Sequence, residues 1–112
     1  MNTQILRGTL IADPRFILTR SGQPKLSFRV AVPRLKSRPP KKPRNVDFLT
    51  VVALGERFAE MKNLLFKGSV VVVLGFVQSR DLEDGRVVVE TVAEYIDIVM
   101  PGVSKRQVDA PA

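Results

Sequence analysis

The side chains in this sequence with the clearest chemistry are cations gathered in one short, proline-rich segment. Residues 33–45 hold four prolines, six Lys or Arg residues and no acid. The six cations are Arg34, Lys36, Arg38, Lys41, Lys42 and Arg44. Proline disfavours helix and strand pairing, so we expect an extended loop. Because blocks of like charge often act as nucleic-acid-binding arms, we expect the loop to bind phosphates; a solvated hairpin tip is the alternative.

The charge of the whole chain is uneven in the same direction. The net charge is +7, but residues 1–55 carry 11 Lys or Arg against two acids, whereas residues 56–112 carry seven against nine. Solubility alone does not require one sign of charge in one half of the chain. The imbalance therefore favours a polyanionic partner.

The sequence offers little support for catalysis or for metal binding. The chain has no His and no Cys, which removes the commonest general base, thiolate ligands and disulfides. Asp81, Glu83 and Asp84 could hold Mg²⁺, but they adjoin Gly85 in an expected hairpin turn, where Asp and Gly are ordinary. No nucleophile–base pair or phosphate-cradling glycine loop accompanies them. We expect no catalytic residue, no metal and no cofactor.

The elements that must position the cations are expected to be strands around one short helix. Leu26, Phe28 and Val30 alternate with polar or small residues, which is the period of a half-buried strand. Residues 56–66 change to a helical period, with Phe58 and Leu64 among the apolar positions. We expect strands at residues 3–12, 25–32, 46–54, 70–79 and 87–99, and the helix at residues 56–66.

This order of elements predicts the fold class and the extent of the domain. A helix between the third and fourth of five strands is typical of an OB-fold, an all-β barrel that binds oligonucleotides. We expect the domain to span residues 1–100 and residues 101–112 to form a short disordered tail. The most apolar run, Val70–Leu74, is far shorter than the ~20 residues of a membrane helix. No signal peptide is visible and cysteine is absent, so we expect no membrane association and a cytoplasmic, nucleoid-associated protein.

Five segments in order resemble bacterial single-stranded-DNA-binding proteins over residues 1–100. They are Asn2–Leu10 followed by Asp13-Pro14, then Phe28–Val32, Asp47–Gly55, Leu64–Gly68 and Gly75–Arg80. The resemblance implies a homotetramer that coats single-stranded DNA in replication, recombination or repair. A primosomal replication protein N-type dimer, which binds DNA and bridges proteins, is the alternative within this relationship. An RNA-binding OB domain is the other alternative.

Binding sites of this kind combine cations that follow the phosphates with rings on which bases stack. Arg29 lies on the strand face opposite the apolar set, and Phe48 matches a stacking position of the family, with core packing as the alternative. The remaining candidates outside the loop are Arg7, Arg80 and Arg86. The sequence departs from the family in three ways. Arg7 replaces a usually apolar residue, and Leu54 and Leu82 stand where the family often has aromatic residues. The short C-terminal segment lacks the acidic tip of the family. We therefore expect no recruitment of replication proteins through such a tip.

Overall fold

The computed structural model describes residues 1–34 and 45–103. Within these ranges the chain forms β1 (Gln4–Leu10), β2 (Arg15–Leu18), β3 (Pro24–Pro33), β4 (Val46–Leu54), the 3₁₀ helix η1 (Glu56–Asn63), β5 (Val70–Asp81) and β6 (Val87–Met100). Five of the loop cations, Lys36, Arg38, Lys41, Lys42 and Arg44, and the end of the expected tail lie outside the described residues.

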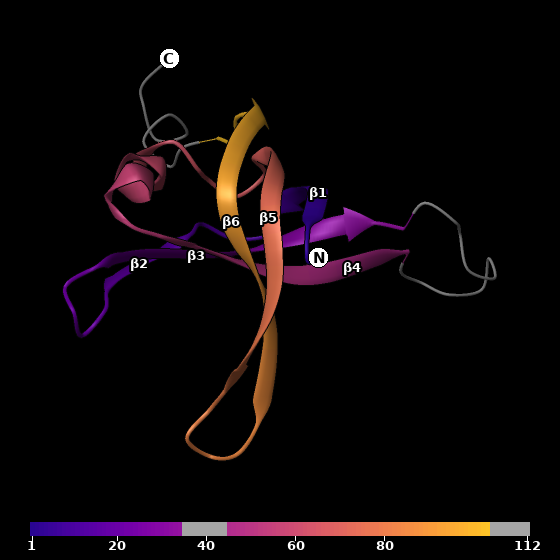
Figure 1. Ribbon diagram of the computed structural model, residues 1–112. Coiled ribbons are helices and arrows are strands. Elements are labelled where there is room, and N and C mark those ends of the chain that lie inside the picture. Colours follow the sequence, from indigo (N-terminus) through magenta and orange to yellow (C-terminus); the bar gives the residue numbers. More distant parts are fainter. Residues whose placement is uncertain (35–44, 104–112) are drawn as a thin grey trace.

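The strands close into a five-stranded barrel, as the sequence predicted (Figure 1). The order is β1–β5–β6–β4–β3, and β1 returns to β3 through Thr9 and Leu10, which face Ala31 and Val30. The opposite closure is a parallel pairing of β4 with β6 through two residue pairs, Val51 with Thr91 and Val52 with Val92. All other neighbouring strands are antiparallel. The predicted OB-fold is confirmed.

The core follows from the alternation read in the sequence. Leu26, Phe28 and Val30 are at most 3% exposed, whereas Arg29 between them is exposed. Val71 and Val73 of β5 are completely buried on the same inner side. The inward set of each strand therefore fills the barrel, and the outward set is left for binding.

Two local predictions were wrong. No strand was expected at Arg15–Leu18, yet β2 pairs with the start of β3 because the first hairpin continues past the kink at residues 11–14. Leu64 was expected on the buried face of the helix, but it is 50% exposed. The helix is 3₁₀ and ends at Asn63, so the helical period does not extend to Leu64.

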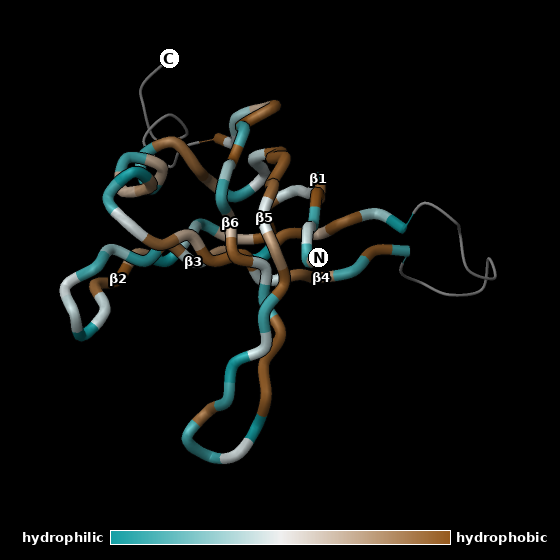
Figure 2. Tube along the Cα trace, viewed as in Figure 1, coloured by the Kyte–Doolittle hydropathy of each residue, from teal (hydrophilic) through white to brown (hydrophobic). Residues whose placement is uncertain are grey.

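The β5–β6 hairpin extends beyond the barrel as a two-stranded arm (Figure 1). Hydrophobic colour follows its β6 side, which begins with three valines, and hydrophilic colour follows its β5 side (Figure 2). Two of these valines, Val87 and Val89, are more than half exposed. The two strands cross closely at Gly75, next to a β-bulge. A Cβ atom at this position would lie 1.9 Å from the carbonyl oxygen of Val92, so the crossing requires glycine.

Candidate nucleic-acid interface

The outward face of β2, β3 and β4 carries polar and cationic side chains beside a few apolar ones. The strand register places Arg15 beside Ser27, Lys25 beside Leu54, Arg29 beside Thr50 and Ala31 beside Phe48. These positions alternate with the buried set, so they point away from the core. The same register therefore brings together residues that are 12 to 29 positions apart in the sequence.

A cleft of about 370 Å³ lies on this face. Arg15 and Arg29 contribute guanidinium groups to it, and Ser27 and Thr50 contribute hydroxyl groups. Neither arginine has an ion-pair partner among the residues that the structure describes. Asp13 also lines the cleft, but its Oδ1 accepts a hydrogen bond from the backbone N–H of Lys67 at 2.8 Å. Two unpaired cations flanking hydroxyl donors are suited to a phosphate group.

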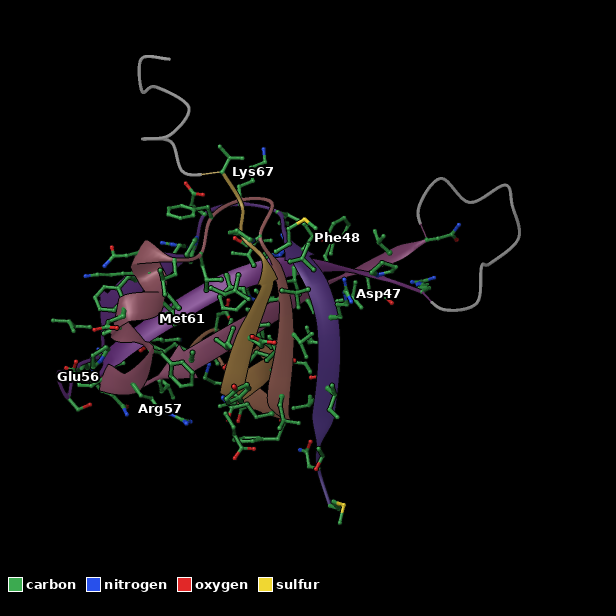
Figure 3. The ribbon with its side chains drawn as sticks, turned by 90° about the horizontal axis from the view of Figure 1, so that it is seen from above. Asp47, Phe48, Glu56, Arg57, Met61 and Lys67 are labelled. Atoms are coloured by element: carbon green, nitrogen blue, oxygen red, sulfur yellow. The ribbon has the colours of Figure 1, made fainter. Side chains whose placement is uncertain are left out.

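Phe48 lies next to this cleft, near the start of β4 and three residues after the proline-rich segment 33–45, called the basic loop below (Figure 3). Its side chain is 38% exposed and lies outside the buried core. The guanidinium carbon of Arg29 lies 5.8 Å from the centre of the ring, a cation–π distance. The ring is therefore partly exposed at the surface and is held beside a cation.

Three further arginines expected at the site, Arg34, Arg80 and Arg86, are ion-paired. Arg34 donates to Asp47 at 2.7 Å at the base of the basic loop, and this hydrogen bond raises the pKa of Arg34, with the charge of Asp47 acting in the same direction. Arg86 donates to Asp84 at 2.6 Å within the turn of the arm. In both pairs the arginine charge is offset locally, which weakens its attraction for a distant anion.

The third pair, Arg80 with Glu90, is the most buried. The nitrogen–oxygen distance is 3.2 Å, and Glu90 is 6% exposed. Burial alone would raise the pKa of Glu90, but hydrogen bonds from Arg80 and Gln78, with the nearby charges of Arg80 and Lys25, hold it below its ordinary value. Glu90 is therefore an enclosed anion held by the neighbouring charges of Arg80 and Lys25.

Arg7 lies on a different part of the barrel. It pairs with Val72 of β5, which in turn pairs with Asp97 of β6, on the outward side of that sheet. The structure thus brings Arg29, Phe48 and Arg80 toward one face and leaves Arg7 apart from them. Sequence reasoning missed Arg15 and Lys25; only the register of β2 and β4 against β3 reveals them, and β2 itself was not expected.

No group of three or more acidic side chains suited to a metal ion occurs in residues 1–34 and 45–103. In the same ranges, no helix has the length and apolar character needed to cross a membrane.

A closed five-stranded barrel with a cationic outward face defines an OB-fold domain of the oligonucleotide-binding kind. Comparison with known proteins identifies the group within this class. The chain belongs to the single-strand binding protein family, whose family model matches residues 1–99. The resemblance predicted from the sequence is confirmed; the primosomal alternative is not.

Individual relatives agree with this assignment. Single-stranded DNA-binding protein 2 of Staphylococcus aureus (strain COL) is 32% identical over 111 residues, 96% of this chain and 79% of that protein. The single-stranded DNA-binding protein of Thermotoga maritima is 33% identical over 100 residues, 85% of this chain and 71% of its own. The solved structure of a deletion mutant of the Thermus aquaticus single-stranded DNA binding protein matches with a TM-score of 0.75 and 26% identity, over 95% of this chain. This chain spans 52% of that protein.

Proposed function

We propose that this chain coats single-stranded DNA through the outward face of β2, β3 and β4, without catalysis. Family membership supports the binding of single-stranded DNA in replication, recombination or repair. The observation that carries the choice of face is the cleft between the guanidinium groups of Arg15 and Arg29, which have no ion pair within the described residues, beside the partly exposed ring of Phe48. Phosphates would lie in the cleft while a base stacks on the ring.

The test is the preference for strand type. A face of cations and one ring suits splayed bases, so a single-stranded oligomer should bind well above the same sequence as a duplex at ~0.15 M salt. Equal affinity for the two would refute the proposal. Competition between DNA and RNA oligomers of one sequence distinguishes the RNA-binding alternative, which requires RNA to win.

We also propose that the basic loop lies over the bound strand and binds additional phosphates. Arg34 at its base is paired with Asp47, and the other five cations lie outside the described residues, so the support is their charge and their closeness to Phe48 in the sequence. Changing all six cations to Gln should lower the salt dependence of binding by ~0.7 in log–log slope for each phosphate that the loop no longer binds. An unchanged slope would assign the loop as a solvated tip.

We propose that the chain acts as a homotetramer in the cytoplasm. β1 pairs with β5 along Gln4–Thr9 but with β3 only at its last two residues, so most of its other edge has no strand partner within the described residues. A largely apolar hollow of about 590 Å³ runs beside this edge. An unpaired strand edge is a template for pairing with a second chain, which would also cover the hollow.

A second surface could join such dimers. Ile5, Leu74 and Tyr95 form a row across β1, β5 and β6, and each is at least 40% exposed. Native mass spectrometry should therefore show a tetramer, and Tyr95→Glu should reduce it to a dimer because it places a charge in the row. A wild-type dimer would favour the primosomal type of adaptor instead.

We propose that residues 104–112 do not recruit replication proteins, because they contain Lys105 and Arg106 against one acid, Asp109. Gly102 still donates its backbone N–H to Ser69 Oγ at 2.9 Å, so the deletion that tests this begins at residue 104. The shortened chain should bind DNA and replication proteins as the full chain does. Loss of a specific protein partner would contradict the expectation.

A further inference from the structure

An enclosed carboxylate on a surface that binds a polyanion restricts how the strand can lie. Glu90 adjoins the same face as Arg29, because the β4–β6 pairing of Val51 with Thr91 sets Thr50 next to Glu90. A phosphate over Glu90 would be repelled, whereas a phosphate over Arg15 and Arg29 is attracted. The phosphates should therefore follow β2 and β3, and the bases should face β4 and β6.

A notch is present where those bases would lie. Its volume is about 130 Å³, and Phe48, Thr50 and Glu90 are among the residues that line it. It lies where β4 and β6 separate beyond their two paired residues. The notch is thus bordered by a ring on which a base can stack, a hydroxyl group and a carboxylate. These groups can hold one edge of a nucleobase by stacking and hydrogen bonding.

One carboxylate oxygen of Glu90, Oε2, accepts no hydrogen bond within the described residues. The hydrogen bonds from Gln78 Nε2, at 3.0 Å, and from Arg80 Nε, at 3.2 Å, both end on Oε1. In the described part of the chain, no completely enclosed side-chain oxygen lacks a hydrogen-bond partner, so Oε2 keeps some contact with solvent although Glu90 as a whole is 6% exposed. Since its pKa is held low, this oxygen only accepts hydrogen bonds at neutral pH.

We infer that the notch holds the Watson–Crick edge of an amino-bearing base, cytosine, adenine or guanine, whose exocyclic amino group donates to Glu90 while its ring stacks on Phe48. Thymine presents carbonyl O4 at the corresponding position, and a carboxylate repels that oxygen. The chain would then coat DNA in any base order but with a bias in base composition. This inference rests on the proposed binding face.

The test compares oligomers of 5-methyldeoxycytidine and of thymidine of equal length, which share the ring methyl group and differ at the base-pairing edge. Competition titrations are run at slightly alkaline pH, so that cytosine remains neutral. A hydrogen bond to a charged acceptor predicts about tenfold tighter binding of the methylcytosine oligomer. Equal binding, or tighter binding of thymidine, would overturn the inference and leave the proposed function intact. Failure to bind either oligomer would overturn the proposed function.

Glu90→Gln tests the assignment to this residue. An amide can donate to thymine O4, so the affinity ratio of the two oligomers should fall to about one, or below it. Lys25→Gln is the matched control, because it removes a neighbouring charge outside the notch and should weaken both oligomers equally. A ratio unchanged by Glu90→Gln, or altered as much by Lys25→Gln, would overturn the assignment. If Glu90→Gln fails to fold, the wild-type ratio still decides the inference.

Discussion

Replacing Arg15 and Arg29 by Gln should change how DNA binding depends on salt more than how the protein folds. Both guanidinium groups border the 370 Å³ cleft, and neither has an ion pair within the described residues. Each phosphate contact on a single strand contributes ~0.7 to the slope of log affinity against log salt concentration. Each single variant should therefore lower the slope by about 0.7 and the double variant by about 1.4.

The assay is a titration of a labelled thymidine oligomer at several salt concentrations between ~50 and ~200 mM. Arg57→Gln is the matched control, because it removes the same charge from η1, on the other side of the molecule from Phe48 (Figure 3). Arg57 lies over the ring of Phe58 at 4.5 Å and lines a separate hollow with Tyr95. If Arg57→Gln lowers the slope as much as Arg15→Gln does, the effect is one of net charge and the reasoning about the cleft is wrong.

Three further variants test other parts of the structure. Phe48→Ala should weaken binding by about 1–3 kcal/mol with little change in melting temperature, whereas Phe28→Ala, at a ring only 3% exposed, should destabilise the fold by about 3–5 kcal/mol; the reverse pattern would place Phe48 in the core. Gly75→Ala should cost at least about 1–3 kcal/mol in urea denaturation, because the new Cβ meets Val92, and wild-type stability would contradict the close crossing. The lowered pKa of Glu90 stabilises the fold above its ordinary value of 4.5, and this contribution is lost as the pH falls through the lower, folded value. Melting temperatures should therefore fall less between neutral and acid pH in Glu90→Gln than in the wild type, and parallel curves would contradict the ion pair.

The fold was predictable from the sequence because apolar and polar residues alternate with a period of two along its main strands. The alternation through Leu26, Phe28 and Val30 determines which side of β3 is buried, and this placed Arg29 outside correctly. β2 was not predictable, because four residues, two of them largely exposed apolar side chains, contain no recognisable period. Its strand character comes from pairing with β3.

The candidate site was less predictable than the fold, since it depends on which residues become neighbours. Arg15 reaches the face only through its register with Ser27, and no local pattern marks it as different from other exposed arginines. Glu90 looks like part of an ordinary strand in the sequence; its enclosure depends on Arg80 and Gln78 across the hairpin. Charge along the sequence indicated a polyanionic partner, but only the sheet shows which charges remain unpaired.

The short parallel contact between β4 and β6 also governs how the domain opens. Two residue pairs, Val51 with Thr91 and Val52 with Val92, hold this side of the barrel closed. Their amide hydrogens should exchange with solvent earlier than those of the long β3–β4 ladder, since fewer neighbouring bonds must break to expose them. A strand of DNA with its phosphates on β3 and a base against β6 would span this junction. It would therefore bind only the closed form of the barrel. By mass action, bound DNA would then slow amide exchange at the junction more than elsewhere, because it stabilises the closed β4–β6 pairing.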